Sequence, residues 1–425
     1  MTQKKKQQYK QSKYKRLIPI LVFLCGVILT LLIFFVFPKL SVVNYSSSVG
    51  YVASTAETIL DTTTEEPVSK ITHIQVPDAV KAIYMTACVA GTPSFRQQLV
   101  DLIDDTELNS IVIDIKDFSG TISFDLKNVE LLGEKGPGCR VRDMQEFISI
   151  LHEKGIYVIG RITVFQDSFY VKSHPDLAVQ KESDKSVWKD YKGISFVEVG
   201  AKEYWDYILT LSKEAHSTGF DEINFDYVRF PSDGPMKNIY FPFSEKIIVG
   251  NPTDGKAIAL EKFFIYLKKE VDKYNKDQEN PMLTSADLFG MVTTNTDDLN
   301  IGQVLERALP YFDYVAPMVY PSHYPPHFNN WNDPNTVPYE LIHFVMSEGV
   351  RRADYLANAT TTPAEIRKHV SSDQLRPWLQ DFDYGGNYDI AEVKAQIKAT
   401  YDSGLDSWML WAASNRYTKG ALEIK

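Results

Sequence analysis

Two aspartates, Asp226 and Asp287, each stand near the end of a short apolar run, where neighbouring side chains limit the hydration of a carboxyl group. Two carboxyl groups across a glycosidic bond are the machinery of sugar hydrolysis, about 5–5.5 Å apart in retaining enzymes and about 6.5–9.5 Å apart in inverting ones. We therefore interpret Asp226 as a nucleophile or charge stabiliser and Asp287 as a general acid or base. Arg229 follows Asp226 closely and is interpreted as the cation that keeps a neighbouring carboxylate ionised.

Both aspartates also have structural interpretations. A buried ion pair of Asp226 with Arg229 or Arg161 would serve only to hold the fold together. Asp287 would have a purely structural role as well if it capped a helix or a loop. The sequence leaves these alternatives open.

The remaining candidate site residues follow other apolar runs. Aromatic rings suit the apolar faces of sugars, and carboxylates such as Asp114 and Asp117 suit their hydroxyl groups. Asp381 and Asp383 are alternative partners for Asp226, although Asp383 equally suits the turn that follows it. The predicted substrate-binding residues are Asp114, Asp117, Arg161, Arg229, Tyr320, His323, Tyr324, Trp378, Asp381, Asp383 and Trp411.

The stretch that contains Asp226 has the period-two pattern of a strand. Gly219 ends the preceding helix, and Pro231 and Gly234 open a loop. The alternation predicts one face with Ile223, Phe225, Tyr227 and, where the strand continues, Arg229, and a second face with Asn224, Asp226 and Val228.

Apolar runs rich in β-formers alternate with amphipathic stretches from residue 80 onward. The predicted strands cover residues 82–89, 110–117, 157–165, 219–226, 283–290, 314–321, 375–383 and 407–413. The predicted helices cover residues 95–108, a segment ending at 154, and residues 202–217, 256–274, 301–309, 340–347 and 390–401. Eight strand–helix units predict a single (β/α)8 TIM barrel, an α/β fold whose active site lies at the carboxyl ends of the strands.

Two features complicate the barrel prediction. Pro317 and Pro377 fall inside the sixth and seventh predicted strands, where proline removes a hydrogen-bond donor. Only about a dozen residues follow the eighth strand, so its helix must be short or missing.

Other chemistries fit the sequence less well. His323 and His327 have the spacing of a metal pair on a helix, but Pro325 and Pro326 exclude a helix between them. No HExxH or CxxC motif occurs, and the glycine-rich residues 133–138 lack the ending of a phosphate-binding loop. We therefore expect no metal and no cofactor, and metal-dependent deacetylation of a polysaccharide is the second enzymatic alternative.

The charge of the chain is unevenly distributed. Residues 1–16 contain seven Lys or Arg and no acid, which leaves 38 basic residues against 55 acidic ones in the remainder. This acidic balance argues against nucleic acid as a partner, because phosphate contacts need clustered cations.

An uncharged apolar run at residues 17–37 is long enough to cross a bilayer core of about 30 Å as a helix. The basic residues 1–16 predict a cytoplasmic amino terminus and an extracellular location for the rest of a single-pass membrane protein. A cleaved signal peptide is the alternative, but its apolar region is shorter, and residues 38–42 contain no A-x-A-like site. The Ser/Thr-rich residues 38–72 predict an extracellular linker to a barrel domain at residues 73–425.

The chain contains three cysteines. Cys25 lies within the apolar run, and the residues before it are too large for a lipid attachment site, so we expect an ordinary helix residue. Cys88 and Cys139 fall in different elements of the extracellular part. We expect Cys88 to be a small buried residue on the first strand, with a disulfide to Cys139 as the alternative.

Residues 219–234, Gly-Phe-Asp-Glu-Ile-Asn-Phe-Asp-Tyr-Val-Arg-Phe-Pro-Ser-Asp-Gly, closely resemble the signature of a bacterial family of predicted glycoside hydrolases. This family is often described as a domain of unknown function. Supporting segments are residues 113–117 with Gly120, 161–165, 316–324 and 377–382. The resemblance covers about residues 80–420 and implies a TIM barrel with glycosidase activity, without naming a sugar or the second carboxylate.

These observations predict a membrane-anchored extracellular glycoside hydrolase that acts on a cell-surface or extracellular polysaccharide. A sugar-binding barrel without catalysis would bind glycans and release no reducing ends. A structural or partner-binding barrel would bind no glycan.

Overall fold

The structure of the protein, a computed structural model, describes residues 71–425. The predicted cytoplasmic segment and membrane helix lie outside the described residues, as does all but the end of the predicted linker. Within residues 71–425, no helix combines the length and the apolar character needed to cross a membrane.

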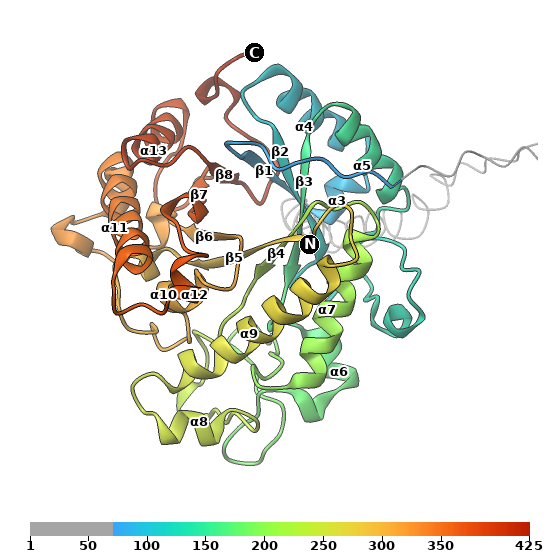
Figure 1. The fold of residues 1–425 in the computed structure, drawn as a ribbon, viewed down its shortest axis with the longest axis vertical. Coiled ribbons are helices and arrows are strands. Elements are labelled where there is room, and N and C mark those ends of the chain that lie inside the picture. Colours follow the sequence, from blue (N-terminus) through green and yellow to red (C-terminus); the bar gives the residue numbers. More distant parts are fainter. Residues whose placement is uncertain (1–70) are drawn as a thin grey trace, which may run out of the picture. The chain divides into compact units, whose positions relative to one another are not determined.

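Eight parallel strands close into a barrel in the order of the chain, and the helices surround it (Figure 1). This confirms the predicted (β/α)8 barrel. The strands are β1 (Lys81–Met85), β2 (Ser110–Lys116), β3 (Tyr157–Thr163), β4 (Glu222–Asp226), β5 (Leu283–Phe289), β6 (Tyr314–Met318), β7 (Trp378–Gln380) and β8 (Trp408–Trp411).

Each of the first seven strands is followed by at least one helix. These helices are α3 (Ala87–Ala90), α4 (Pro93–Asp105), α5 (Met144–Glu153), α6 (Ser168–Ser173), α7 (Lys202–His216), α8 (Glu245–Gly250), α9 (Gly255–Asn275), α10 (Leu305–Ala308), α11 (Pro338–Asn358), α12 (Ala364–Arg367) and α13 (Ile390–Asp402). In the described chain, β8 is followed only by the short 3-10 turn Lys419–Ala421, which confirms the expected short or missing last helix.

Helix α11 is longer than the predicted helix over residues 340–347. Its second half carries charged residues that interrupt the apolar pattern, yet Arg352 is buried there. The guanidinium of Arg352 bonds to both carboxylate oxygens of Glu306 and to the backbone oxygens of Val292 and Thr293. These bonds compensate for the burial of the charge, so the helix continues past the point where its apolar stripe weakens.

Side chains alternate between two apolar clusters on the two faces of the barrel sheet. On β1, Ile83 and Met85 pack in the larger cluster, which also includes the helix residues, whereas Ala82 and Tyr84 belong to a smaller cluster made largely of strand residues. The alternation follows from the pleat of a strand. It divides the inside of the barrel from the layer between the sheet and the helices.

The two strand prolines leave the barrel closed but shorten its sixth ladder. The paired register of β6 and β7 consists of Met318 and Trp378 alone. Beside it, the backbone N–H of Arg376 donates to Val315 and that of Val319 donates to Trp378. Pro317 and Pro377 supply no N–H here, which explains why β7 is much shorter than the predicted strand over residues 375–383.

The segment that precedes β1 is attached to the barrel at the amino ends of β3 and β4. The hydroxyl of Thr72 lies 2.8 Å from Nδ1 of His152, and the backbone N–H of Ile74 donates to Oδ1 of Asp221 over 3.0 Å. Asp221 also accepts from the N–H of Val158 and lies 2.9 Å from Nε2 of His152. This buried carboxylate therefore fixes the amino-terminal segment to the barrel.

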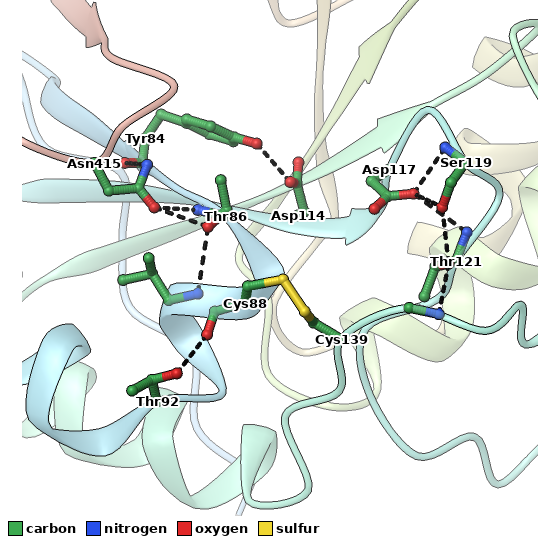
Figure 2. The surroundings of a disulfide bond; sticks show 12 residues. Tyr84, Thr86, Cys88, Thr92, Asp114, Asp117, Ser119, Thr121, Cys139 and Asn415 are labelled. Atoms are coloured by element: carbon green, nitrogen blue, oxygen red, sulfur yellow. Dashed lines mark hydrogen bonds between the residues drawn. A yellow bond between two sulfur atoms is a disulfide. The ribbon is translucent and has the colours of Figure 1, made fainter. Parts of the chain in front are cut away.

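The expectation that Cys88 is a buried strand residue is wrong. The first strand ends at Met85, and the Thr86 side chain caps a short helix, α3, by accepting from the N–H of Val89. Cys88 is exposed on this helix and forms a disulfide with Cys139, with a Cα–Cα distance of 5.0 Å (Figure 2). A threonine cap after an apolar run is the local signal that ends the strand.

The disulfide predicts a measurable share of the stability, because it closes a loop of 51 residues between α3 and the segment after β2. Reduction, or the double change Cys88→Ser and Cys139→Ser, should lower the free energy of unfolding by about 2–4 kcal/mol. Urea unfolding of the full chain with and without reductant measures the change. Adding reductant to the double variant is the control, and an equal effect of reductant on both proteins would contradict the prediction.

Candidate active site

A pocket of about 440 Å³ opens at the carboxyl ends of the strands, where a barrel of this kind carries its active site. It lies within the size range of small-ligand sites. Its lining residues are Arg161, Asp226, Tyr227, Arg229, Asp287, Phe289, Gly290, Met291, Met318, Tyr320, His323, Tyr324 and Trp411.

Most of the predicted site residues meet in this pocket. Both proposed catalytic acids, Asp226 and Asp287, line it. The predicted substrate-binding residues that line it with them are Arg161, Arg229, Tyr320, His323, Tyr324 and Trp411.

Asp114 and Trp378 are predicted substrate-binding residues that stand behind the pocket wall. Asp114 accepts from Nη1 of Arg161 over 2.7 Å and from the hydroxyl of Tyr84 over 2.5 Å. Trp378 is fully buried, and its indole N–H donates to Oδ1 of Asp287 over 2.8 Å. These two residues position the residues that line the pocket, and Trp378 offers no ring face to a sugar.

Asp117, Asp381 and Asp383 lie outside the pocket lining and hold loops. Asp117 accepts from the N–H and hydroxyl of Ser119 in the turn after β2 (Figure 2). Asp381 accepts from the N–H and hydroxyl of Thr418, and Asp383 accepts from the N–H of Tyr388. The turn interpretation of Asp383 is thus the one that its contacts support.

Arg161 holds the Asp226 carboxylate in place. Its Nε and Nη2 both donate to Oδ2 of Asp226, over 3.1 and 2.5 Å, while Oδ1 accepts the backbone N–H of Tyr227 over 2.6 Å. Nη1 of the same arginine binds Asp114. One guanidinium therefore fixes two carboxylates, and the predicted partner Arg229 forms no ion pair with Asp226 among the described residues.

Asp287 has the opposite environment. It is 1% exposed, and its Oδ1 accepts from the side-chain amide of Asn224 over 2.9 Å and from the indole of Trp378. Burial raises the pKa of Asp287 to about 8, and the nearby negative charge of Asp226 adds to the effect. The carboxyl group is therefore protonated at neutral pH, as a general acid must be.

The register of the strands brings these two acids together. Phe225 on β4 pairs with Ala286 on β5, and Asp226 and Asp287 are the next residue of each strand. Adjacent strands lie about 4.8 Å apart, so the two aspartates stand side by side at the same level of the barrel. The barrel thus supplies a carboxylate and a protonated carboxyl group in one pocket.

The predicted alternation along the fourth strand fails after Asp226. Tyr227 has a left-handed φ of 53°, which reverses the direction of the side chains that follow. Tyr227 and Arg229 consequently line the pocket, whereas Val228 packs in the larger apolar cluster, which also includes the helix residues. A left-handed tyrosine leaves no signal in an alternating pattern, so the sequence places Tyr227 and Arg229 on the wrong face.

Aromatic residues form much of the pocket wall. Trp411 stacks on Tyr84 with a ring-centroid distance of 4.0 Å and meets Trp378 edge to face at 5.4 Å. Burial raises the pKa of Tyr320, and the charges of Asp287 and Asp226 raise it further, so its hydroxyl keeps its proton. Burial also lowers the pKa of His323, which favours a neutral imidazole.

Tyr84 and Asn224 are functional positions that the sequence prediction missed. Both lie inside the barrel and support the acids of the site. The hydroxyl of Tyr84 donates to Asp114, and the side-chain amide of Asn224 donates to Asp287. For Asn224 a signal existed, because it lies two residues before Asp226 on the same face of the strand. Among residues 71–425, no group of three or more His, Cys, Asp or Glu side chains is arranged to hold a metal ion.

Three solved structures are similar to this chain to different extents. The glycoside hydrolase domain of PgaB (BpsB) from Bordetella bronchiseptica matches with a TM-score of 0.57 and 15% identity, over 82% of this chain and 99% of that domain. A hypothetical protein from Ruminiclostridium thermocellum is 28% identical over 48% of this chain and 96% of its own, with a TM-score of 0.40. The catalytic domain of β-amylase from Paenibacillus polymyxa is 11% identical over 81% and 95% of the two chains, with a TM-score of 0.48.

The likeness to the Bordetella domain identifies the fold, and the lower TM-scores add nothing to it. No curated protein matches the chain. A closed parallel barrel with paired acids at the carboxyl ends of its strands is an architecture typical of glycoside hydrolases. A family model described as "Putative glycosyl hydrolase domain" matches residues 82–417, and the chain belongs to this family of glycoside hydrolases.

The raised pKa of Asp287 predicts how stability depends on pH. Between about pH 4 and pH 8 the unfolded chain releases this proton while the folded barrel keeps it, so Asp287 lowers the stability of the fold as pH rises. Asp287→Asn has no proton to lose and keeps an oxygen for Asn224 and Trp378. Its stability relative to wild type should rise from pH 5 to pH 8 by on the order of a few kcal/mol.

Thermal unfolding of both proteins at the two pH values measures this change. A stability difference that is the same at pH 5 and pH 8 would show that Asp287 titrates normally in the folded barrel.

Proposed function

We propose that the protein is a membrane-anchored extracellular glycoside hydrolase that cleaves a cell-surface or extracellular polysaccharide, with Asp226 and Asp287 as its catalytic pair. The observation that carries this proposal is the contrast between two neighbouring acids. Asp287 keeps its proton up to a pH of about 8, while Asp226 is bound to the guanidinium of Arg161. When two neighbouring carboxyl groups have such different environments, one can act as the acid of a reaction and the other as its base or nucleophile.

In this mechanism Asp287 donates its proton to the glycosidic oxygen as the bond to the anomeric carbon breaks. The carboxylate of Asp226 attacks that carbon or stabilises the positive charge that develops on the sugar ring. Water then supplies the hydroxyl group of the new reducing end, and Asp287 recovers its proton. Arg161 and Trp378 keep the two acids in position throughout.

The pocket wall provides the remaining contacts of the proposed reaction. Trp411 offers an aromatic surface for the apolar face of a sugar ring. Tyr320 and His323 present a protonated hydroxyl and a neutral imidazole, which suit sugar hydroxyl groups. These residues support a carbohydrate substrate over a hydrophobic one.

Two features support the proposed location. The basic residues 1–16 precede the apolar run at residues 17–37, an order that favours an extracellular location for the chain that follows. The Cys88–Cys139 disulfide in the barrel agrees with an oxidising compartment, because cytosolic proteins keep their thiols reduced.

Asp226→Asn and Asp287→Asn should each lower turnover by about 10²–10⁴-fold, because each change removes a carboxyl group that acts on the bond. The assay is the release of reducing ends from purified cell-wall and capsular polysaccharides by the full-length protein in detergent. The rate with wild-type protein should fall as pH rises through about 8, where Asp287 loses its proton.

Asp383→Asn is the matched control, since this acid also follows a strand but holds a turn outside the pocket. It should retain wild-type turnover. Hydrolysis that survives Asp226→Asn would remove this residue from the mechanism. Glycan binding without any turnover by the wild-type protein would instead identify a sugar-binding barrel.

Labelling of thiols in cells tests the location. A maleimide carrying a polymer tag should modify one cysteine, Cys25, in protein denatured without reductant, and all three after reduction. We expect this result because Cys88 and Cys139 of a barrel outside the cytoplasm form a disulfide, and disulfide-bonded cysteines do not react with maleimide. Protease added to intact cells should also digest the barrel. Three reactive thiols without reductant, together with protection from protease, would place the barrel in the cytoplasm.

A further inference from the structure

Arg229 is a pocket-lining cation without a carboxylate partner. The residue is only 8% exposed, and its one hydrogen bond within the described chain runs from Nη1 to the backbone oxygen of Phe230, over 3.0 Å. The other buried arginines each bind a carboxylate: Arg161 binds Asp226 and Asp114, Arg352 binds Glu306, and Arg376 binds Glu222. Arg229 is the exception in residues 71–425.

Aromatic rings hold this guanidinium in place. Its carbon lies 5.0 Å from the ring centroid of Tyr227, 5.1 Å from that of Phe289 and 5.9 Å from that of Phe196. Such rings attract a cation and exclude water, but they accept no N–H hydrogen bond of ordinary strength. Nε and Nη2 of Arg229 are therefore still available as donors.

Arg229 lines the pocket, and its two free donors keep contact with solvent. The unbonded Nε and Nη2 of Arg376 are sealed from solvent inside the barrel, whereas the corresponding atoms of Arg229 are not sealed. Burial acts to lower the pKa of both Arg161 and Arg229. The charges of Asp226 and Asp114 reverse this effect at Arg161, while the charges near Arg229 do not offset it.

The charges around the pocket leave Arg229 without a counterion of its own. Asp226 and Asp114 are engaged by Arg161, and Asp287 is protonated at neutral pH. The charges of Tyr227, Asp226, Asp233 and Asp190 raise the pKa of Arg229, but none of these residues forms an ion pair with it in the described chain. A desolvated cation without a partner is unfavourable, and an anion from the substrate would offset this cost.

We propose that Arg229 binds a carboxylate on the sugar next to the scissile bond, so that the substrate is an acidic polysaccharide containing uronic acid units. The proposal rests on the glycoside hydrolase function proposed above. The planar guanidinium fork matches a planar carboxylate through two parallel N–H bonds. Arg229 lines the same pocket as Asp226 and Asp287, which places the acidic sugar at the reacting unit. The chain as a whole carries a net charge of −10, so an acidic polymer needs a specific cation of this kind.

The test uses polysaccharides in matched pairs. Polygalacturonate, alginate, hyaluronan and heparosan are each compared with their carboxyl-reduced forms, in which every carboxylate has become a hydroxymethyl group on the same backbone. Dissociation constants are measured in detergent with full-length protein that carries Asp287→Asn. Release of reducing ends is measured with full-length protein that retains Asp287. At least one native polymer should bind about 30-fold tighter than its reduced form.

Arg229→Gln removes the charge and keeps an amide donor, so it should bring the ratio between native and reduced polymers close to one. Arg229→Lys keeps the charge without the fork and should preserve part of the ratio, and circular dichroism checks that both variants fold. Equal binding of native and reduced forms by the protein with Arg229 intact would overturn the proposal. An equal loss for both forms in Arg229→Gln would also overturn it, because a structural role predicts that result.

The two proposals fail in different ways. Release of reducing ends from neutral polymers alone would leave the hydrolase function standing and reject the acidic substrate. Selective binding of acidic polymers without any release would retain the role of Arg229 and reject hydrolysis.

Discussion

The guanidinium of Arg161 joins three neighbouring strands at the carboxyl ends of the barrel strands. It extends from β3, binds Asp114 on β2 and Asp226 on β4, and lies 5.2 Å from the ring centroid of Trp411 on β8. A buried cation with two carboxylates is stable only when its hydrogen bonds are nearly complete, and here all three guanidinium nitrogens bind an acid. The position of Asp226, and with it the contrast to the protonated Asp287, depends on this contact.

The barrel could be predicted from the sequence because its strands and helices have separate hydrophobic periods. Eight apolar runs alternated with amphipathic stretches, and the structure has eight strands in the same order. The ends of the elements were less predictable. Thr86 ends β1 through a cap, and the prolines at 317 and 377 shorten the ladder between β6 and β7. Both effects depend on single hydrogen bonds that hydrophobicity does not report.

The site could be predicted as far as strand geometry holds. Residues at the carboxyl ends of barrel strands converge, which brings Asp226, Asp287 and Arg161 into one pocket. The pattern could not separate residues that line the pocket from those behind it, because Trp378 and Asp114 lie on the same inner face as their partners. It also could not anticipate the left-handed backbone at Tyr227, which is favoured by no local glycine.

The attachment of the amino-terminal segment has a consequence for access. Thr72 and Ile74 bind His152 and Asp221 at the amino ends of the strands, whereas the pocket opens at the carboxyl ends. The amino-terminal segment therefore joins the barrel at the amino ends of the strands, and a sugar chain would enter at their carboxyl ends. Thr72 and Ile74 can therefore be replaced to loosen this attachment without changing any residue that lines the pocket.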